Sequence, residues 1–371
     1  MDETLTCVCC GAEVHRDEVC FVGEQPLCRD CADEETFVCD NCGFRHWNSD
    51  NQGDSRYDLC PTCREEYFVA CSECGRLIPN SEAWYDGDDD DTPPYCESCY
   101  REKVGDALHP YSYKPSPIFY GDGPLYLGVE PEVDGAGQSA SHARTVLNVI
   151  NRREEYAYMK TDGSLDDGLE LVTHPCTLEE HRTKVPWADT VAAFREMHYN
   201  SHNAGTCGLH VHVNRDALGE HSAAQDETIS KILYLFERFW QEILRFSRRT
   251  ESQMNHWAAR YGYKNSAKEI LEHAKYDSGN GRYACVNLTN HDTIEFRAFR
   301  GTLKLNTLIA TLQFVDRICR VALALSESEI KDLSWPEFVL RLTDESTPEL
   351  IQYLKERRLY INEPITAEWE V

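Results

Sequence analysis

The sequence contains no run of about 18 apolar residues, the length that a membrane-spanning helix requires. It also contains no GxxxxGK[ST] motif, which excludes a Walker-type loop as the means of binding a nucleotide. Basic residues are few: 37 Lys and Arg stand against 64 Asp and Glu, and the formal charge is −27. We therefore expect no binding to nucleic acid by charge alone. No signal-peptide pattern is present at MDETLTC, so we expect a soluble cytoplasmic protein.

Cysteine, by contrast, is abundant and unevenly distributed. The chain of 371 residues contains 18 cysteines, and 14 of them lie between Cys7 and Cys99. A secreted, disulfide-bonded protein is one alternative, but most of these cysteines occur as C-x-x-C, a spacing typical of metal ligands. The length suggests two or three domains, and the cysteine-rich region is expected to be one of them.

This region is a threefold repeat, in which pairs beginning at Cys7, Cys39 and Cys71 are spaced 32 residues apart and each is followed by a second pair. We expect three zinc modules with four cysteine ligands each, at about residues 1–36, 37–68 and 69–105. Such small units bury little core, so zinc is expected to supply their folding free energy. The ligands of the three structural Zn²⁺ ions would be Cys7, Cys10, Cys28, Cys31, Cys39, Cys42, Cys60, Cys63, Cys71, Cys74, Cys96 and Cys99. Cys9, Cys20, His15 and His46 are left over, as packing residues or spare thiols.

The expected zinc modules are acidic. Residues 1–105 contain 25 Asp and Glu against 8 Lys and Arg, a net charge of −17 before metal binding. Part of this charge lies in YDGDDDDTPPY, between the two pairs of the third module. Zinc modules that bind nucleic acid present basic faces, so we expect these to dock a protein or peptide substrate. A structural lid over the active site is the alternative that stays open.

Downstream of the array, the sequence predicts a linker and an α+β domain. Residues 106–124 are rich in proline and are expected to be extended, with neither helix nor strand. We expect a catalytic domain at 125–325 and a C-terminal helical extension at 326–371. The predicted strands lie near 125–134, 156–161, 168–173, 207–214, 283–289 and 292–300. The predicted helices lie near 141–151, 178–198, 222–249, 266–276, 305–325, 335–342 and 347–358, with Ser222 and Ser266 as N-caps.

Several of these strands pair an apolar face with a charged one. In LYLGVEPEVDG, Glu130 and Glu132 share a face, because alternate side chains of a strand lie on the same side, and Val129 and Val133 lie opposite. The segments LELVT, GLHVHVN and TIEFRAF repeat the pattern and place on their charged faces Glu170, His210, His212, Glu295 and Arg297. A solvated sheet face is one alternative. In a single sheet, however, these residues would form an acidic cavity suited to Mg²⁺ or Mn²⁺.

Two further residues bear on this cavity. Asp162 precedes Glu170 by eight residues, across the turn DGSLDDG, and could reach the cavity from the far side of a hairpin. An ordinary polar turn is the alternative. Pro131 separates the paired glutamates and removes one donor from the ladder, which favours an edge strand or a locally irregular one.

The order of these motifs resembles the amidoligases, a family of carboxylate–amine ligases in the glutamine synthetase superfamily. The segments that carry the resemblance are DGSLDDGLELVTHP, LHVHV, RYACVNL and EFRAFRGT, within residues 120 to 325. The resemblance implies a curved antiparallel sheet backed by helices, whose charged face binds ATP and two or three Mg²⁺ or Mn²⁺ ions. The cysteine-rich repeat lies outside it and resembles a tandem zinc-ribbon or treble-clef array.

Carried over residue by residue, the resemblance also implies roles. The cation near the amino-acid substrate would be held by Glu132, Glu170 and Asp162, and the cation on the terminal phosphates by Glu130, His210 and Glu295. Asp162 stands where the synthetases prefer Glu, so its shorter reach could place it behind the ligands rather than among them. His212 would contact the nucleotide and Arg297 the transferring phosphoryl group, with Arg282, Arg300 and Lys304 as further phosphate or carboxylate contacts.

The activity that follows is ATP-dependent amide or peptide bond formation through an acyl phosphate, with a small amino acid or amine as co-substrate. Two other functions stay open: an H-x-H metallohydrolase that cleaves amides, and a non-enzymatic zinc-module adaptor.

Overall fold

The computed structural model describes residues 4–85, 92–104, 107–276 and 279–361, and it divides the chain into two compact units, Met1–Asp106 and Ala107–Val371. The acidic residues 86–91 of YDGDDDDTPPY and the end of the predicted C-terminal extension, 362–371, lie outside the described residues. Within the described ranges, every helix is too short or too polar to cross a membrane.

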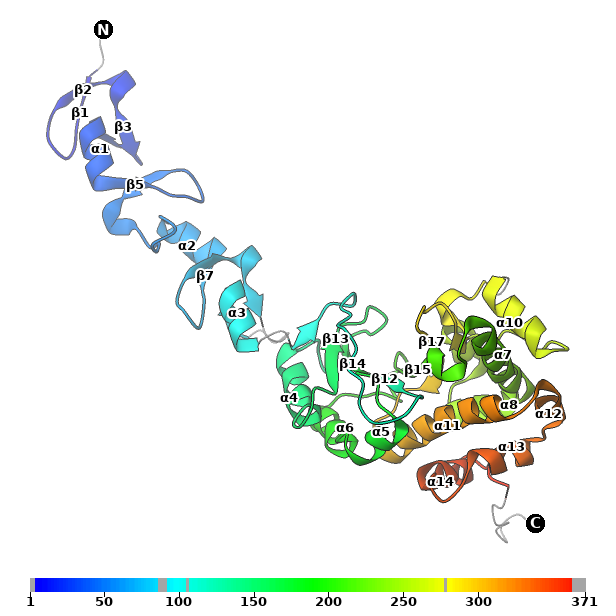
Figure 1. Cartoon of the computed structure of the whole chain (residues 1–371). Helices are drawn as coiled ribbons and strands as arrows, with labels where there is room; N and C mark the ends of the chain where they lie inside the picture. Colours follow the sequence, from blue (N-terminus) through cyan, green and yellow to red (C-terminus); the bar gives the residue numbers. More distant parts are fainter. Residues whose placement is uncertain (1–3, 86–91, 105–106, 277–278, 362–371) are drawn as a thin grey trace, which may run out of the picture. The chain divides into compact units, whose positions relative to one another are not determined.

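The first unit consists of three small modules that follow one another along the chain (Figure 1). The first contains β1 (Thr4–Thr6), β2 (Glu13–His15), η1 (Arg16–Glu18), β3 (Cys20–Val22), β4 (Gln25–Leu27) and α1 (Arg29–Glu35). The second contains β5 (Thr36–Val38), β6 (Arg45–Trp47), η2 (Asn48–Asp50) and α2 (Pro61–Tyr67). The third contains β7 (Phe68–Ala70), β8 (Leu77–Pro79), η3 (Asn80–Glu82), β9 (Trp84–Tyr85), β10 (Pro94–Tyr95) and α3 (Glu97–Val104). Each module has its own small apolar cluster, in which cysteines take part.

A seven-stranded mixed sheet forms the centre of the second unit, in the order β11-β13-β14-β12-β15-β17-β16. Its strands are β11 (Leu108–His109), β12 (Leu127–Asp134), β13 (Ala157–Lys160), β14 (Gly168–Thr173), β15 (Gly208–Asn214), β16 (Val286–Asn287) and β17 (Thr293–Arg300). The prediction of a wholly antiparallel sheet is wrong at one edge, because β11 pairs with β13 in parallel. The expectation of a linker without strands is wrong for the same reason, since β11 lies inside 106–124.

Helices contribute the other half of the core of this unit. They are α4 (Ala140–Ile150), α5 (Leu178–Thr183), α6 (Trp187–Glu196), η4 (Arg215–Leu218), α7 (Ser222–Arg238), α8 (Trp240–Ser247), α9 (Glu251–Trp257), α10 (Ala267–Tyr276), η5 (Gly281–Tyr283), α11 (Leu305–Ala324), α12 (Glu327–Asp332), α13 (Trp335–Leu342) and α14 (Pro348–Glu356). Val129, Val211 and Phe296 from the sheet share one core with Ile232 and Phe314 from α7 and α11. This burial keeps the apolar strand faces on the inside and leaves the charged faces for a site.

Some predicted helices are divided. The segment 178–198 forms two helices because Pro186, which lacks an N–H, precedes α6. The segment 222–249 is interrupted at Phe239, and α9 was not predicted. The N-cap of α7 is His221 rather than the predicted Ser222, whereas Ser266 accepts the N–H of Glu269 as expected of a cap.

Pro131 lies in β12, a central strand of the sheet, so the prediction of an edge strand is wrong. The alternative prediction, a locally irregular strand, is confirmed. β12 pairs with β15 over 127–131 and with β14 over 132–134. On the β14 side, the N–H of Val129 donates to the hydroxyl of Thr173 at 2.9 Å instead of a backbone carbonyl. A side chain thus replaces the ladder bond next to the proline, which allows β12 to remain central.

The buried imidazole of His181 makes the stability of the second unit sensitive to acid. Its Nε2 lies 2.9 Å from the carbonyl of Leu127, and the indole of Trp187 donates to its Nδ1 at 3.3 Å. Burial lowers the pKa of His181 to about 4. The unfolded chain, with a histidine pKa of about 6.5, therefore binds the proton first as the pH falls.

We expect wild-type protein to lose about 1.4 kcal/mol of unfolding free energy per pH unit from this group between pH 6.5 and 4, and none above that window. Urea unfolding followed by circular dichroism at several pH values measures this slope. In His181→Gln the slope should be smaller, whereas His291→Gln, at an exposed histidine, should behave as wild type. Equal slopes in all three proteins would contradict the prediction.

Candidate metal centres and active site

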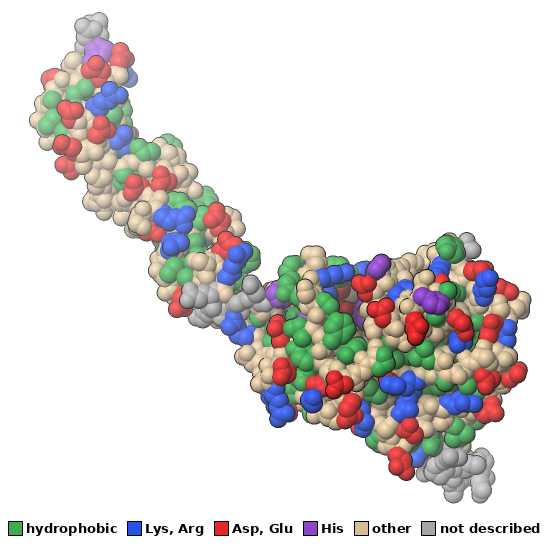
Figure 2. Space-filling view, in the orientation of Figure 1, with side chains coloured by type: hydrophobic (Ala, Val, Ile, Leu, Met, Phe, Trp, Pro, Cys, Tyr) green, Lys and Arg blue, Asp and Glu red, His purple; other side chains and the backbone are tan. Residues whose placement is uncertain are grey.

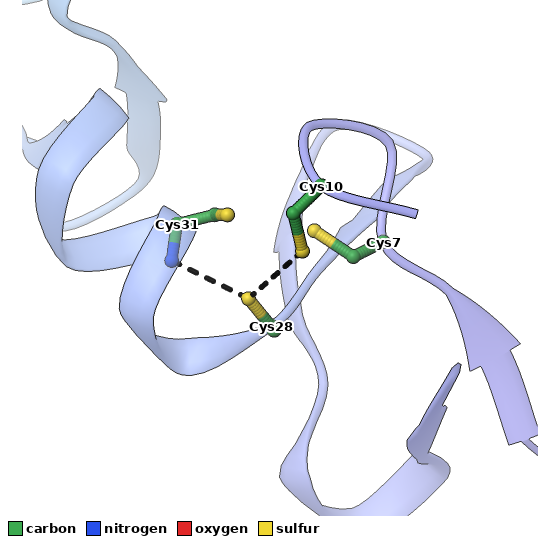
Figure 3. Close-up of side chains that lie close together, drawn as sticks. All are labelled: Cys7, Cys10, Cys28 and Cys31. Carbon is green, nitrogen blue, oxygen red and sulfur yellow. Dashed lines mark hydrogen bonds between the residues drawn. The ribbon is translucent and has the colours of Figure 1, made fainter. Parts of the chain in front are cut away.

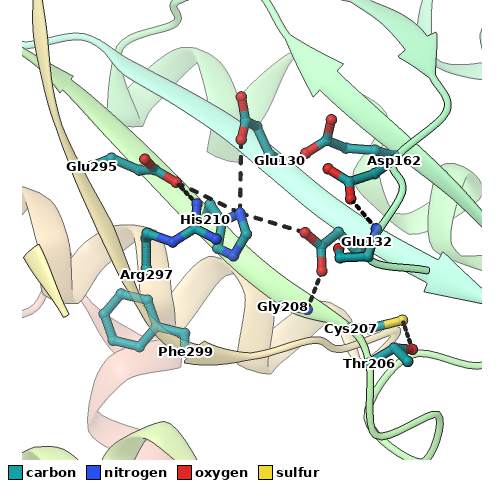
Figure 4. Close-up of polar contacts among 12 residues, drawn as sticks. Glu130, Glu132, Asp162, Thr206, Cys207, Gly208, His210, Glu295, Arg297 and Phe299 are labelled. Carbon is teal, nitrogen blue, oxygen red and sulfur yellow. Dashed lines mark hydrogen bonds and ion pairs between the residues drawn. The ribbon is translucent and has the colours of Figure 1, made fainter. Parts of the chain in front are cut away.

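The charged faces of β12, β14, β15 and β17 bring distant residues together (Figure 4). The strand register sets Glu130 opposite His210, and His212 opposite Glu295. It also sets Glu132 opposite Glu170. Directly paired residues on one sheet face have neighbouring side chains. The sheet thus assembles four carboxylates and two imidazoles whose positions span 166 residues of the chain.

His210 lies at the centre of this group (Figure 4). Its Nδ1 is 3.6 Å from Glu132 Oε1, 3.7 Å from Glu295 Oε1 and 3.8 Å from Glu130 Oε2. These separations are too long for hydrogen bonds. They match the spacing of about 3 to 4 Å between two ligands of one cation, given metal–oxygen distances of about 2.1 Å.

Among the described residues, the sets that could hold a cation include Glu130, His212 and Glu295, and also Glu130, Glu170 and His210. Within each set, one ligand atom from each residue lies within 4.8 Å of the others. Both sets combine carboxylate oxygens with one imidazole nitrogen. Oxygen-rich sets of this kind suit Mg²⁺ or Mn²⁺ better than the thiolate-preferring metals. Each of these sets fits a divalent cation, and the two sets share Glu130.

The pKa shifts of the clustered side chains also favour the binding of a cation. Burial raises the pKa of Glu130, but the adjacent His212 and His210 outweigh it and hold that pKa well below its usual range. Burial lowers the pKa of His212, yet Glu130 and Glu295 raise it to about 9. Burial and the repulsion from Glu130 raise the pKa of Glu170 well above its usual range. Without a cation, the cluster holds protons to offset carboxylate repulsion, and a divalent ion would replace them.

Lys160 belongs to the same face, and the sequence reasoning did not include it. It pairs with Glu170 across β13 and β14, and its Nζ lies 3.0 Å from Glu170 Oε2. Burial lowers the pKa of Lys160, but Glu170 and Glu130 outweigh this and raise it. The alternation of AYMK places Lys160 on the face of Tyr158, so the pattern alone could have suggested it, but its partner depends on strand register.

Gly208 and Arg249 were also missed. The N–H of Gly208 donates to Glu132 Oε2 at 2.5 Å. A Cβ atom at this position would lie 2.5 Å from His210 Nε2 and 2.8 Å from Arg249 Nη2, so any larger residue would displace both. Arg249 is 8% exposed, and burial, opposed by Glu132, lowers its pKa to about 10. Gly208 thus permits a guanidinium to approach the cluster closely.

The predicted cationic residues lie in different places. Arg297 pairs with Glu295 in the cluster, and its guanidinium lies 6.0 Å from the ring centre of Tyr283. Arg282 donates to the hydroxyl groups of Tyr111 and Tyr283. Arg300 lies at the end of β17, opposite Gly208.

The contacts of Lys304 and Asp162 are an ion pair and a hydrogen bond within a turn. Lys304 lies 3.0 Å from Glu356 of α14 in an exposed ion pair, and this contact does not bring it to the cluster. Asp162 accepts the N–H of Ser164 at 2.7 Å and so stabilises the turn after β13. The same turn is fixed from β12 by Asp134, which accepts the N–H groups of Asp166 and Asp167.

Three four-sulfur sets occur in the first unit, and they are the predicted ones: Cys7, Cys10, Cys28 and Cys31; Cys39, Cys42, Cys60 and Cys63; Cys71, Cys74, Cys96 and Cys99. Figure 3 shows the first set, with all four side chains directed toward one another. The sulfurs of Cys10 and Cys28 are 3.7 Å apart, and those of Cys74 and Cys96 are 3.8 Å apart. A zinc tetrahedron with Zn–S bonds of about 2.3 Å has edges of about 3.8 Å, so the sets fit Zn²⁺.

A local turn builds the first half of each set. The N–H groups of Gly11, Gly43 and Gly75 donate to the carbonyls of Cys7, Cys39 and Cys71. All three glycines have φ between 72° and 77°, which a side chain would make unfavourable. The repeated C-x-x-C-G was a readable sign of this turn. The second half lies at helix N-termini, where the sulfurs of Cys28 and Cys60 accept N–H groups of α1 and α2.

The four left-over residues stand outside these sets. Cys9 is exposed and Cys20 is partly buried. His15 accepts the N–H of Asp17, and the ring of His46 lies 5.8 Å from that of Phe37. Their positions agree with packing or capping, and none is a member of a four-sulfur set.

No curated protein sequence matches the chain. The family model described as "Putative amidoligase enzyme" matches residues 148–319, which include β14, β15 and β17 but not β12 or the zinc modules. Residues 148–319 of the second unit are therefore similar to this amidoligase family, a similarity that suggests an enzyme of the ligase kind.

Proposed function

We propose that the protein is an ATP-dependent carboxylate–amine ligase that forms an amide or peptide bond through an acyl phosphate. One observation carries the proposal: Glu130, Glu170, His210, His212 and Glu295 converge in two sets with ligand spacing, on a domain that matches amidoligases. Phosphoryl transfer requires mainly positioning and neutralisation of charge, which such a cluster provides.

The roles of the side chains follow from their positions. Two Mg²⁺ or Mn²⁺ ions would be held by the two ligand sets and would supply charge neutralisation on the phosphates. Glu132 would complete the set nearer Glu170, while Arg297 stabilises negative charge on the transferred phosphoryl group. Lys160 holds Glu170 in place.

The proposed reaction has two steps. A substrate carboxylate oxygen attacks the terminal phosphorus of ATP, and ADP leaves. The amine nitrogen of the co-substrate then attacks the carbonyl carbon of the acyl phosphate, inorganic phosphate leaves with the bonding electrons, and the nitrogen loses a proton to a base. The burial of Glu132, Glu170, His210 and Glu295 would limit the access of water to the acyl phosphate.

For the zinc modules we propose docking of a protein or peptide partner. Their net charge of −17 over residues 1–105 fits a basic surface on that partner. Zinc itself would serve structure, because each set has four sulfur ligands and leaves no open coordination position. The cytoplasmic location expected from the sequence is part of the same proposal, since thiolate sites require reduced cysteines.

The two other functions fit less well. A metallohydrolase with an H-x-H strand usually holds its metal with further histidines. The described sets instead supply one imidazole each, with two carboxylates. A non-enzymatic adaptor would not require a buried cluster of mutually repelling carboxylates, whose retention costs stability.

Nucleotide-dependent stabilisation tests the proposal. At an ATP concentration 100 times the Kd, with Mg²⁺ present, unfolding free energy should rise by about 2.7 kcal/mol. For a domain of this size that corresponds to a rise in melting temperature of roughly 5 °C. ATP without added Mg²⁺ is the control and should have a smaller effect.

Product formation provides the second measurement. Incubation with ATP, Mg²⁺ and an amino-acid mixture, with and without candidate peptides, should release phosphate and give mass gains equal to condensation with loss of water. An unchanged melting temperature with no phosphate release would overturn the ligase proposal and favour the adaptor.

A further inference from the structure

A cavity of about 530 Å³ lies between α8, the residues after it and the segment that follows α14. Its lining contains five arginines: Arg245, Arg248, Arg249, Arg357 and Arg358. Glu242 is the acidic residue of the lining, and Trp335, Tyr360 and Leu359 supply apolar surface. The last part of this lining, Arg357 onward, lies outside the region that matches the amidoligase family.

Four of these five arginines lack a carboxylate partner in the part of the chain that the structure describes. Among the described residues, Arg245, Arg248, Arg249 and Arg357 form no ion pair within 4.0 Å, whereas Arg260, Arg317 and Arg320 elsewhere in the unit do. Figure 2 shows acidic and basic side chains interspersed over the near face of this unit. The chain as a whole has a formal charge of −27, so a cavity lining with this excess of positive charge is unusual for it.

The guanidinium groups are held in place by backbone carbonyls. Arg357 donates from Nε and Nη2 to the carbonyl of Arg245, at 3.0 and 2.9 Å. Arg248 donates to the carbonyls of Arg300 and Gly301, and Arg249 donates to that of Phe299 at 3.2 Å. Fixed donors lose little freedom when an anion binds.

Two observations indicate that the arrangement is built for a ligand. The Nε atoms of Arg248 and Arg249 have no hydrogen-bond partner among the described residues, and Arg249 is only 8% exposed. A buried donor without a partner costs free energy that a bound acceptor would recover. In addition, Arg248 and Arg358 have φ of 63° and 55°, conformations that side chains rarely adopt and that occur preferentially at functional sites.

Arg249 connects the cavity with the carboxylate cluster. It lines the cavity, and its Nη2 closely approaches Gly208. Glu132 and Arg297 both influence its pKa through their charges. Arg249 thus belongs both to the cavity lining and to the surroundings of Gly208, whose N–H donates to Glu132.

We propose that this cavity binds an acidic peptide segment, with two or three Asp or Glu side chains, and presents it to the carboxylate cluster. The role of the segment as a substrate rests on the proposed ligase function. The binding of the segment to the cavity is independent of that function. Guanidinium groups bind carboxylates in forked geometry, and Trp335 and Tyr360 offer apolar surface to the methylene groups of Glu. A magnesium nucleotide fits less well, since Glu242 is the one carboxylate among these lining residues and no imidazole accompanies it.

Isothermal titration calorimetry without ATP tests the proposal, with the peptides Gly-Glu-Glu-Glu-Gly and Gly-Gln-Gln-Gln-Gly as probes. The full-length protein should bind the first peptide and not the second, more weakly at high salt. Arg245→Gln and Arg358→Gln, both at exposed positions, should each weaken binding about tenfold. Arg341→Gln removes the same charge from an exposed site outside the cavity and should leave the Kd within about twofold.

The proposal would be overturned by equal binding of both peptides, by no effect of the two cavity substitutions, or by displacement of the acidic peptide by inorganic phosphate. Residues 362–371 follow the cavity directly and contain glutamates at 363, 368 and 370. If the peptide bound only to a variant ending at Ile361, the occupant would be the chain's own C-terminal segment, and the proposal would fail. If the peptide binds as expected but no amide forms, the ligase function fails and the binding site remains.

Discussion

Replacing Glu295 with glutamine is expected to lower ATP turnover by about 10³-fold, because the residue belongs to a candidate cation-ligand set and pairs with Arg297, the arginine proposed to contact the phosphoryl group. The glutamine keeps the shape of the side chain and can still accept the amide N–H of Asn287, which lies 2.8 Å from Glu295 Oε2. The fold should therefore persist while the ligand charge is lost. Phosphate release in steady state, with Mg²⁺ in excess, measures the effect.

A second substitution and a matched control complete this experiment. Glu130→Ala removes the carboxylate shared by both ligand sets and should be at least as damaging. Glu272→Gln removes a surface carboxylate in an exposed pair with Lys268 and should leave turnover unchanged. Zinc content should be equal in all the proteins. Wild-type turnover in either site variant would remove the argument for the cation cluster.

The composition of the cluster could be predicted because strands alternate with period two. The alternation separated Glu130 and Glu132 from Val129 and Val133 without knowledge of the partners. The apolar side of each strand then had to be the buried one, which left the charged faces on the same side of the sheet. Pattern alone was sufficient to this point.

Strand order and register were beyond prediction. They depend on contacts between residues far apart in the chain, such as Glu130 with His210. For this reason Pro131 could be assigned to an edge, although β12 lies between β14 and β15. A side-chain acceptor, Thr173, compensates for the interrupted ladder, and no local rule identifies such a partner 44 residues away.

Lys160 and Arg249 were not predicted for the same reason, namely that their contacts depend on residues far apart in the chain. Lys160 lies beside Glu170 because of the register of β13 against β14. Arg249 follows the left-handed Arg248 at the end of α8, and it reaches the cluster only because Gly208 has no side chain. Neither residue belongs to a motif with characteristic spacing. In the zinc modules the ligands are close in sequence, so their spacing was informative.

Removal of zinc is expected to unfold the first unit and leave the second folded. The second module has a small apolar cluster of Phe37, Leu59 and its own cysteine ligands, to which Phe68 and Leu77 of the third module contribute. A cluster of this size cannot offset the conformational entropy of the module. Structural zinc typically contributes about 10 kcal/mol or more, which exceeds the stability of most domains.

Native mass spectrometry should find three Zn²⁺ ions per wild-type chain and two in Cys60→Ser, which lacks one sulfur of the second set. Limited proteolysis should then cut Cys60→Ser within residues 37–68, because loss of the metal exposes that backbone. Cys9→Ser is the matched control: Cys9 is exposed and outside the sets, so three ions and wild-type resistance are expected. ATP turnover with small substrates should be retained in Cys60→Ser, since the cation cluster belongs entirely to the second unit. A wild-type chain without zinc, or one that resists proteolysis after chelation, would show that the sulfur sets serve another purpose.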